Sequence, residues 1–490
     1  MRPVVSVIEH LHRDRAVAED AVAGRFTCAG ETLELGPEPD WTRDPLPADE
    51  EWRIDWVKFY YGLDLAHAFR TTGDPRFRDA WEQLVASFLE QVPPAADPSE
   101  VTARRIVNWI YAWQGFGSLG NGLEPALAQR IADEARHVWN TLTPERNHRT
   151  LELYALAVVA FAFTDRPLLD VAVAELDRNL AEDFRADGVH REGSTHYHMI
   201  ALRSFAGLRE NARRHGIALP VGFDERLARA AEFARHCCRP DRTIPALSDA
   251  DTGDYTTLLE LLGVEPADTG ASFPDGGYFT QRGNDRYLIF DCGPLGDGGH
   301  GHYDLLSFEA CAGGQPLIVD PGRFTYADGA DRRWFKGTAA HNTVCVDGLD
   351  QTPYARKAPR GPVAEHRFLG RGTKPGHDEL AGEARSPAYE AVHRRRIAFV
   401  DERHWVIHDD LAGEREHRYD LRFHLAPGEA WASGSAVLGP GVALVIDGAD
   451  EIAVEPGWVS PRYGVRHEAP VVSAVARGRD ASFRTEVLPR

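Results

Sequence analysis

Histidines and carboxylates that could transfer protons or bind a metal ion are concentrated in one stretch, Asp297–Asp347. His300 and His302 flank a glycine, while Asp320 lies in a Val-Asp-Pro-Gly run. His341 precedes Asn-Thr-Val. Side chains repeat with a period of two in an extended segment, so the imidazoles of His300 and His302 should project from one face. Imidazole and carboxylate groups are common agents of proton transfer and common zinc ligands.

The same residues provide a plausible ligand set for a divalent ion. His302, Asp320 and His341 together offer two imidazoles and a carboxylate, which suit zinc. Short apolar runs at 317–319 and 343–346 predict strands, because they are rich in β-branched residues and bounded by Pro, Gly and Asp. A sheet would hold polar groups at its strand ends in fixed positions. The spacing does not distinguish a zinc site from a buried hydrogen-bond network that contains histidines, so both interpretations stay open.

A second cluster precedes a predicted helix and contains Glu192, His196 and Tyr197. Residues 190–198 read His-Arg-Glu-Gly-Ser-Thr-His-Tyr-His, with three histidines in nine residues. The structural alternative is a helix whose N-terminal amides are capped by Ser194, with solvated neighbours. Capping does not require a tyrosine between two histidines, so this composition favours a functional site.

Two further motifs lie within the predicted helical half. Arg105 and Asn108 stand near Trp109, where an arginine and an amide could line a sugar-binding cleft. The structural alternative, which we favour, is a solvated arginine beside a core tryptophan. Asn147 and His148 precede a long apolar run and therefore mark the start of a helix. Asparagine is a common helix cap, but polar groups at a helix N-terminus also suit anion binding.

Hydrophobic periodicity divides the chain into a helical half and a strand-rich half. Apolar residues recur at three- and four-residue steps from Asp49 to about Arg239, separated by short breakers such as Thr-Gly-Asp-Pro, and the predicted helices include 75–91 and 99–116. Helices joined by short loops predict antiparallel helical hairpins. From Gly276 onward the runs are short and punctuated by Gly and Pro, with strands predicted at 405–408 and 419–424 among others, which indicates an antiparallel β-sandwich. The predicted domains are an irregular arm at 1–45, a helical domain at 46–265 and a β-sandwich at 266–490.

Composition and charge limit the classes of partner. The 490 residues carry a formal net charge of −20, which argues against nucleic acid and anionic membranes as partners. A local basic groove could still bind an acidic sugar. The N-terminus lacks the apolar core of a secretory signal, and no apolar run approaches the length of a membrane span, so we expect a cytoplasmic protein. Six scattered cysteines without CxxC spacing predict reduced thiols and not a disulfide framework.

Taken together, these motifs resemble those of the heparinase II/III-like polysaccharide lyases. The resemblance is carried by Asn147-His148, Glu-Gly-Ser-Thr-His-Tyr-His at 192–198, Gly-His-Gly-His-Tyr-Asp at 299–304, Asp-Pro-Gly at 320–322 and Ala-His-Asn-Thr-Val at 340–344. It implies an α+β multidomain fold in which an (α/α) toroid of helical hairpins precedes an antiparallel β-sandwich. The reaction it implies is β-elimination at a uronic acid. The proton at C5 is removed, the glycosidic oxygen leaves from C4, and a 4,5-unsaturated product forms.

The resemblance also implies a role for each candidate residue. Tyr197 would act as the acid, and as the base on one sugar epimer, with His300 as the second acid/base group. Asn147 and His148 would grip the uronate carboxylate. The ligands of a structural divalent ion, expected to be zinc, would be His302, Asp320 and His341. The residues that would contact the rest of the substrate are Arg105, Asn108, Glu192 and His196.

The implied partner is an acidic oligosaccharide or polysaccharide. The oligomeric state stays open, a homodimer included. Two alternatives also stay open for the function. A glycoside hydrolase on the same scaffold would need two carboxylates that flank the glycosidic bond, with Glu152, Glu192 and Asp249 as candidates. A non-catalytic protein that binds acidic glycans would keep the fold without turnover.

Overall fold

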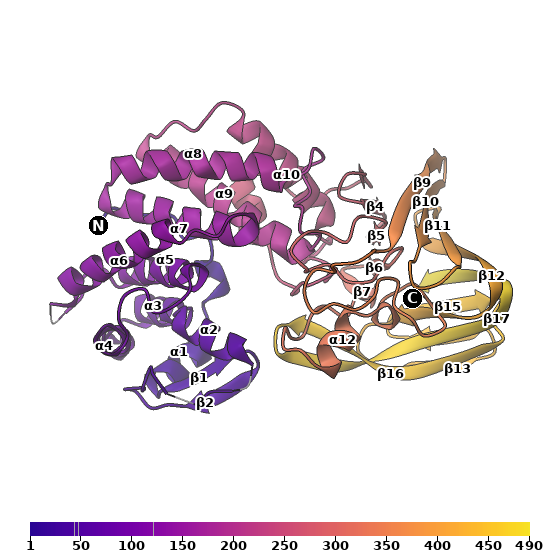
Figure 1. Ribbon diagram of the computed structural model, residues 1–490, viewed down its shortest axis with the longest axis horizontal. Helices are drawn as coiled ribbons and strands as arrows, with labels where there is room; N and C mark the ends of the chain where they lie inside the picture. Colours follow the sequence, from indigo (N-terminus) through magenta and orange to yellow (C-terminus); the bar gives the residue numbers. More distant parts are fainter. Residues whose placement is uncertain (44, 48, 121) are drawn as a thin grey trace. The chain divides into compact units, whose positions relative to one another are not determined.

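The chain forms two compact units. The computed structural model describes residues 1–43, 45–47, 49–120 and 122–490 (Figure 1). The N-terminal unit comprises Met1–Asp183 and Ile200–Leu227, and the C-terminal unit comprises Phe184–Met199 and Ala228–Arg490. Within the described ranges, no helix combines the length and the apolar character that crossing a bilayer requires.

The N-terminal unit consists mainly of helices that pack against their neighbours in the chain. They are α1 (Arg15–Val22), α2 (Glu50–Val57), α3 (Tyr61–Thr72), α4 (Pro75–Gln91), α5 (Ser99–Phe116), α6 (Leu123–Asn140), α7 (Arg146–Phe163) and α8 (Arg166–Asp183). Helix α5 packs against α3, α6 and α7, and α7 packs against α8. Helices α9 (Thr195–His215) and α10 (Phe223–Cys237) each contribute residues to both units.

Short polar signals set the helix boundaries. The side chains of Asp14, Asp49 and Asp74 accept hydrogen bonds from the backbone N–H groups two residues on, which caps α1, α2 and α4. Pro75 opens α4, where its missing N–H would have no helical partner in any case. Gly73 ends α3 in the left-handed conformation, with φ at 72°. The Thr-Gly-Asp-Pro sequence therefore ends one helix and starts the next.

The prediction of an irregular arm at 1–45 was wrong. The described part of this segment contains the 3₁₀ turn η1 (Glu9–Leu11), helix α1 and an antiparallel hairpin of β1 (Arg25–Cys28) and β2 (Glu31–Glu34). The helix has eight residues and each strand has four, which is too short for the periodicity that revealed the longer helices. The hairpin turns through Ala29 and Gly30, whose φ values are 47° and 78°.

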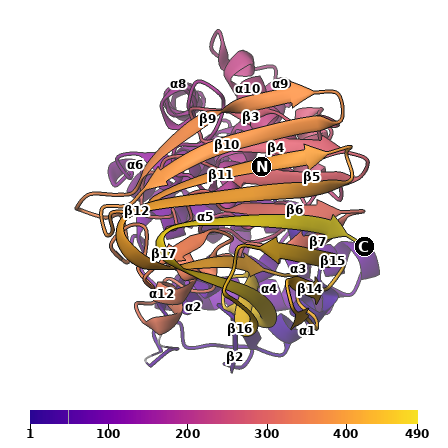
Figure 2. The ribbon, with the colours of Figure 1, turned by 90° about the vertical axis from the view of Figure 1, so that its right-hand side faces the viewer.

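The C-terminal unit contains two antiparallel sheets. The smaller sheet has the order β3-β4-β5-β6-β7, and the larger has the order β13-β14-β15-β17-β12-β11-β10-β9, with β16 paired to β17 and β8 to β12. Figure 2 shows β9, β10, β11, β12 and β17 side by side.

The strands of the smaller sheet are β3 (Ser272–Phe273), β4 (Tyr278–Gly283), β5 (Arg286–Asp291), β6 (Phe308–Ala312) and β7 (Gln315–Ile318). Those of the larger sheet are β8 (Val344–Val346), β9 (Glu365–Lys374), β10 (His377–Arg385), β11 (Val392–Val400), β12 (His404–His424), β13 (Trp431–Ser433), β14 (Ala436–Gly439), β15 (Val442–Asp447), β16 (Glu451–Arg462) and β17 (Val465–Pro489). The remaining helical elements are α11 (Thr256–Leu262), α12 (Ala330–Lys336) and η2 (Thr338–Ala340).

The apolar core of this unit lies between the two sheets. Phe279 and Phe290 of the smaller sheet share one buried cluster with Ile397 and Trp405 of the larger sheet. Two sheets that bury one common core form a sandwich. The predicted fold class, helical hairpins followed by an antiparallel β-sandwich, is confirmed.

Two connections of the sandwich carry four of the candidate residues. The segment between β5 and β6 carries His300 and His302, and the segment between β7 and β8 carries Asp320 and His341. The predicted strands at 317–319 and 343–346 correspond to β7 and β8, so these polar residues do lie next to strand ends. His300–His302 is not a strand, although both imidazoles face one carboxylate, as described below.

Candidate active site

Tyr197 and His300 form the centre of the site. Tyr197 lies in the first turn of α9, and its ring stacks on the imidazole of His300 with 3.9 Å between centroids and 29° between planes. The Tyr197 backbone N–H donates to the Ser194 hydroxyl, which in turn donates to the carbonyl of Asp249 over 2.8 Å. Ser194 therefore contacts the start of the helix as a capping residue would, and it also joins that helix to the loop that carries Asp249.

The Tyr197 hydroxyl belongs to a short hydrogen-bonded chain. It lies 2.9 Å from the hydroxyl of Tyr326, which accepts a hydrogen bond from Arg323 Nη1 over 2.6 Å. Arg323 Nε in turn donates to Asp251 Oδ1 over 2.8 Å. Burial raises the pKa of Tyr197 to about 12, although Arg323 and the Tyr326 hydroxyl act in the opposite direction. The phenol is therefore protonated at neutral pH and can donate a proton.

Asp249 holds both histidines of the His-Gly-His run. Its Oδ2 lies 3.1 Å from His300 Nδ1, and its Oδ1 lies 2.9 Å from His302 Nε2. Arg332 pairs with both oxygens, with Nη2 at 2.9 Å from Oδ2. Burial on its own would raise the pKa of Asp249, but Arg332 and the two histidines hold it well below its usual range. Asp249 is therefore a fixed anion that orients His300.

This contact places a proton on one nitrogen of His300. A carboxylate only accepts hydrogen bonds, so His300 Nδ1 donates to Asp249, and Nε2 is the nitrogen left to face a substrate. Nε2 lies 3.6 Å from an oxygen of Glu192. The His300 side chain is 19% exposed to solvent. The arrangement of a buried aspartate behind a partly exposed imidazole is that of an oriented general base.

Glu192 and His196, which the sequence predicted as substrate-binding residues, also lie at the site. Glu192 is fully buried beside His300. The ring of His196 meets that of Tyr197 edge to face at 5.9 Å, and His196 Nδ1 lies 3.3 Å from the Tyr255 hydroxyl. The structure therefore brings Glu192, His196, Tyr197 and His300 together.

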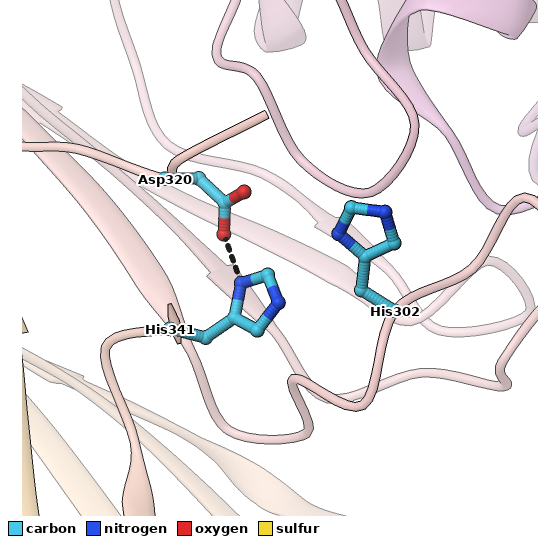
Figure 3. A group of neighbouring side chains, drawn as sticks. All are labelled: His302, Asp320 and His341. Atoms are coloured by element: carbon cyan, nitrogen blue, oxygen red, sulfur yellow. Dashed lines mark hydrogen bonds and ion pairs between the residues drawn. The ribbon is translucent and has the colours of Figure 1, made fainter. Parts of the chain in front are cut away.

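His302, Asp320 and His341 form a buried group that suits a metal ion. One donor atom from each lies within 4.8 Å of the others (Figure 3). His341 Nδ1 lies 2.7 Å from Asp320 Oδ2. His302 Nδ1 is buried and has no hydrogen-bond partner among the described residues. Because its Nε2 contacts Asp249, the unpartnered Nδ1 is the nitrogen left for an ion.

The protonation states of these three residues fit a metal ligand set. Burial lowers the pKa of His302 to about 3 and also lowers that of His341, so both rings are neutral and can offer a lone pair. Burial raises the pKa of Asp320 well above its usual range, so this carboxylate needs a nearby cation to stay ionised. The carboxylate of Asp249 behind His302 is a typical outer partner of a zinc-bound histidine.

Four candidate residues lie in the N-terminal unit. Arg105 on α5 is fully buried, and its guanidinium donates to Glu134 over 3.1 Å and to Asp97 over 2.8 Å. Asn108 donates to the carbonyl of Lys58 over 2.8 Å. These contacts are internal to the helical unit. The solvated arginine of our structural alternative was wrong, because Arg105 is fully buried, and the predicted substrate contacts of the two residues stay predictions.

Asn147 and His148 lie in the first turn of α7. Arg146, which opens this helix, has a φ of 71°, a left-handed value that is uncommon for a residue other than glycine. The predicted helix start at these residues is therefore correct. Asn147 is buried and His148 is partly exposed.

Sequence analysis missed most of the residues that hold Tyr197 and His300. Arg323, Tyr326 and Arg332 lie in an irregular segment and the short helix α12, and carried no recognisable spacing. Asp249 was named as a candidate carboxylate of a hydrolase, and its contact with the two histidines was not predicted. Its flanking Ser-Asp-Ala-Asp run was a loop signal, and the left-handed Ser248 before it, with φ at 65°, fits that signal.

Comparison with known proteins places the chain in a family. A sequence model of the protein family described as heparinase II/III N-terminus matches residues 5–269. A second family model, described as heparinase II/III-like, C-terminal, matches residues 265–488. The chain belongs to the heparinase II/III family. It is therefore a polysaccharide lyase, and the resemblance inferred from its motifs is confirmed.

Individual relatives of this heparinase II/III family lyase are distant in sequence. A heparin-sulfate lyase of Bacteroides stercoris is 22% identical over an alignment of 525 positions, which covers 90% of this chain and 75% of that protein. One from Bacteroides thetaiotaomicron is 21% identical, over 80% of this chain and 63% of that protein. A crystal structure of heparinase III superposes with a TM-score of 0.83 at 18% identity, covering 100% of this chain and 87% of the other. At this identity the structural likeness concerns the fold alone.

Proposed function

We propose that this lyase cleaves glycans that contain uronic acid, with Tyr197 and His300 as its proton-transfer pair. The observation that carries the proposal is the stacked pair itself, in which a protonated phenol lies against an imidazole oriented by Asp249. Two of the relatives described above are named heparin-sulfate lyases, which supports an acidic glycan as the substrate class.

β-Elimination places two demands on such a pair. A base must remove the proton at C5 of the uronate, and an acid must protonate the glycosidic oxygen that leaves from C4. Both groups must also reach adjacent carbon atoms of one sugar ring. Two rings with centroids 3.9 Å apart are close enough to serve neighbouring atoms of one substrate.

Tyr197 is the proposed acid. Its raised pKa keeps the proton on the phenol until the leaving oxygen develops negative charge. Arg323, through the Tyr326 hydroxyl, would stabilise the phenolate that remains after transfer. On the sugar epimer whose C5 proton faces this side, Tyr197 would act as the base in its deprotonated form, which the positive charge of Arg323 would have to stabilise.

His300 is the proposed second acid/base group. Its Nδ1 proton is committed to Asp249, so Nε2 is the atom that would accept the C5 proton. The resulting imidazolium would be stabilised by Asp249 and by Glu192, whose oxygen lies 3.6 Å from Nε2. Glu192 and His196 would help to position the substrate.

Asn147 and His148 are proposed as the partners of the uronate carboxylate. The support is the family resemblance and their place in the first turn of α7, where backbone N–H groups favour an anion. Neutralising the carboxylate would make the C5 proton more acidic and so lower the barrier to its removal.

We further propose that His302, Asp320 and His341 hold a zinc ion. Such an ion would cross-link the segments before β6 and β8 as a structural element. We expect chelation to lower the thermal midpoint of the C-terminal unit and His341→Ala to remove the bound zinc, both measurable by calorimetry and metal analysis. A protein that contains no zinc in metal analysis would contradict this assignment.

The function is tested by ultraviolet absorbance of the conjugated double bond in the product. Purified protein is incubated with a panel of uronic-acid glycans and with a neutral glycan as control. The proposal predicts absorbance growth on at least one uronate substrate and none on the neutral one. Cleavage of glycans without absorbance growth would contradict it.

A further inference from the structure

A basic patch lies beside the proposed proton-transfer pair and takes no part in it. The patch consists of Arg333 on α12 and of Arg356 and Lys357 in the connection between β8 and β9. All three side chains are exposed. The guanidinium of Arg333 lies 4.4 Å above the ring of Tyr354, which joins the helix to the connection.

The connection is fixed against the residues of the site. Tyr303 exchanges two hydrogen bonds with the backbone of Ala355, accepting from its N–H over 2.7 Å and donating to its carbonyl over 3.3 Å. Lys336 Nζ donates to the carbonyls of both Gly299 and Lys357, at 2.9 and 3.3 Å. The backbone at Lys357 is therefore held beside the residue that precedes His300.

Close packing confirms that position. A Cβ atom added to Gly299 would lie 2.4 Å from the backbone nitrogen of Ala358, so only glycine allows this approach. Gly299 also has a φ of +90°, which other residues rarely adopt. On the opposite side, Arg356 Nη1 lies 3.5 Å from the carbonyl of Tyr326, whose hydroxyl contacts Tyr197. The connection that carries Arg356 and Lys357 thus lies against Gly299, the residue before His300, and reaches the backbone of Tyr326.

The three cations have no acidic partner in the part of the chain that the structure describes. No described carboxylate lies within ion-pair distance of Arg333, Arg356 or Lys357. The nearby Asp328 instead accepts from the Tyr354 hydroxyl, and Asp331 pairs with Arg466. In a chain with a net charge of −20, uncompensated cations beside a reaction centre indicate a place for an anion.

We propose that Arg333, Arg356 and Lys357 form a subsite for an anionic substituent, a sulfate or a carboxylate, on a sugar that neighbours the cleaved bond. This rests on the proposed function, because it assigns the subsite to the same substrate. Guanidinium groups suit such anions, since their N–H groups can bind two oxygens at once. The patch would select acidic glycans by charge next to the scissile uronate.

The test measures binding to the full-length Tyr197→Phe protein, which should bind substrate without consuming it. Three oligosaccharides of one length are compared by calorimetry: a sulfated one, its desulfated form, and the desulfated form with reduced carboxyl groups. Arg356→Gln and Lys357→Gln are introduced singly. Arg477→Gln is the matched control, because Arg477 is exposed on β17 and its guanidinium has no carboxylate partner among the described residues, although its backbone N–H donates to Asp450. Circular dichroism and the thermal midpoint confirm that each variant folds.

We expect each patch substitution to weaken binding of the recognised ligand by roughly tenfold, and the control to change it less than about twofold. Loss confined to the sulfated ligand identifies a sulfate. Loss that persists after desulfation and disappears after carboxyl reduction identifies a carboxylate. Changes below about twofold with every ligand, equal losses with all three, or no binding of any ligand would overturn the subsite.

The two proposals fail in different ways. If the unmutated enzyme forms unsaturated product but Arg356→Gln and Lys357→Gln bind as the parent does, the subsite is wrong and the function stands. If these substitutions weaken binding but no glycan yields unsaturated product, the subsite stands and the reaction is wrong.

Discussion

Two buried aspartates in the C-terminal unit hold the same kinds of partner but differ in what their histidines can reach. Asp409 on β12 lies 2.7 Å from both His393 Nε2 and Arg395 Nε. Asp249 likewise binds histidine and an arginine, here Arg332. In both places burial alone would raise the aspartate pKa, and the cationic and hydrogen-bonding partners lower it instead.

The difference lies on the far side of the imidazole. The His393 side chain is 4% exposed, and its Nδ1 is buried without a hydrogen-bond partner in the described residues. The His300 side chain is 19% exposed and stacks on Tyr197, which is itself linked to Tyr326. A His–Asp–Arg group therefore does not identify a catalytic site by composition. Access to the second nitrogen and a second proton-transfer group beside it make the difference.

The largest expected effect comes from removing one hydroxyl. Tyr197→Phe should lower kcat by about 1,000-fold, because a positioned acid contributes roughly 10²–10⁴ and the stacked ring is retained. Tyr389→Phe, a buried tyrosine of the sandwich core, is the control and should change kcat less than about threefold. Steady-state kinetics measure both. A Tyr197→Phe enzyme within tenfold of the parent would remove this residue from the mechanism.

Neutralising Asp249, the aspartate of the active site, should have the next largest effect on kcat. Asp249→Asn keeps the shape but removes the negative charge and replaces one of the two acceptor oxygens with an NH2 donor, so His300 is no longer oriented as before and kcat should fall by about 100-fold while KM changes little. The same change leaves Arg332 buried without its anion, so the thermal midpoint should fall as well. Kinetics on folded protein, checked by circular dichroism, separate the two effects. Unchanged kcat would show that Asp249 is only structural.

The matched change in the sandwich should affect stability alone. Asp409→Asn leaves Arg395 without its anion and should cost about 3 kcal/mol of unfolding free energy, because it breaks a buried ion pair. The folded fraction should retain kcat within about threefold. Denaturant unfolding followed by kinetics measures both quantities. A 100-fold fall in kcat would break the distinction between the two aspartates.

The smallest predicted effect is a pH dependence of stability. The pKa of Asp409 is lowered to about 2 because Arg395 and His393 outweigh the burial that would raise it. Its unfolded value is about 3.9, so its stabilisation, about 2–3 kcal/mol, is fully present above that pH and lost as the pH falls toward 2. The gap in unfolding free energy between the parent and Asp409→Asn should therefore shrink steadily below about pH 4. A gap that stays constant down to pH 2 would show that Asp409 titrates normally.

Local signals in the sequence predicted the elements better than the contacts between them. Helices predicted at 75–91 and 99–116 correspond to α4 (Pro75–Gln91) and α5 (Ser99–Phe116), because caps and periodicity lie in the local sequence. By contrast, predicted strands at 405–408 and 419–424 are parts of one strand, β12. Polar residues at its centre and a register shift between Ala412 and His417 concealed its continuity.

The same difference between local signals and long-range contacts applies to the active site. Tyr197 and His300 stood out because unusual residues cluster around them in the chain. The aspartate and arginine that orient His300, Asp249 and Arg332, are 83 positions apart and meet only after folding. Arg105 shows the converse, since its residue type suggested a sugar contact, while its buried pairing with Glu134 depends on α6. Burial and pairing of this kind are not encoded in local spacing.

The most direct test of the central claim, cleavage by β-elimination, is to run the reaction in water enriched in a heavy oxygen isotope. Elimination breaks the C4–oxygen bond without adding water, so the products should contain no solvent oxygen, and each cleavage should create one double bond. Mass spectrometry of the products from an active uronate substrate measures this. Heavy oxygen at the new chain end, without a double bond, would show hydrolysis and contradict the roles assigned to Tyr197 and His300.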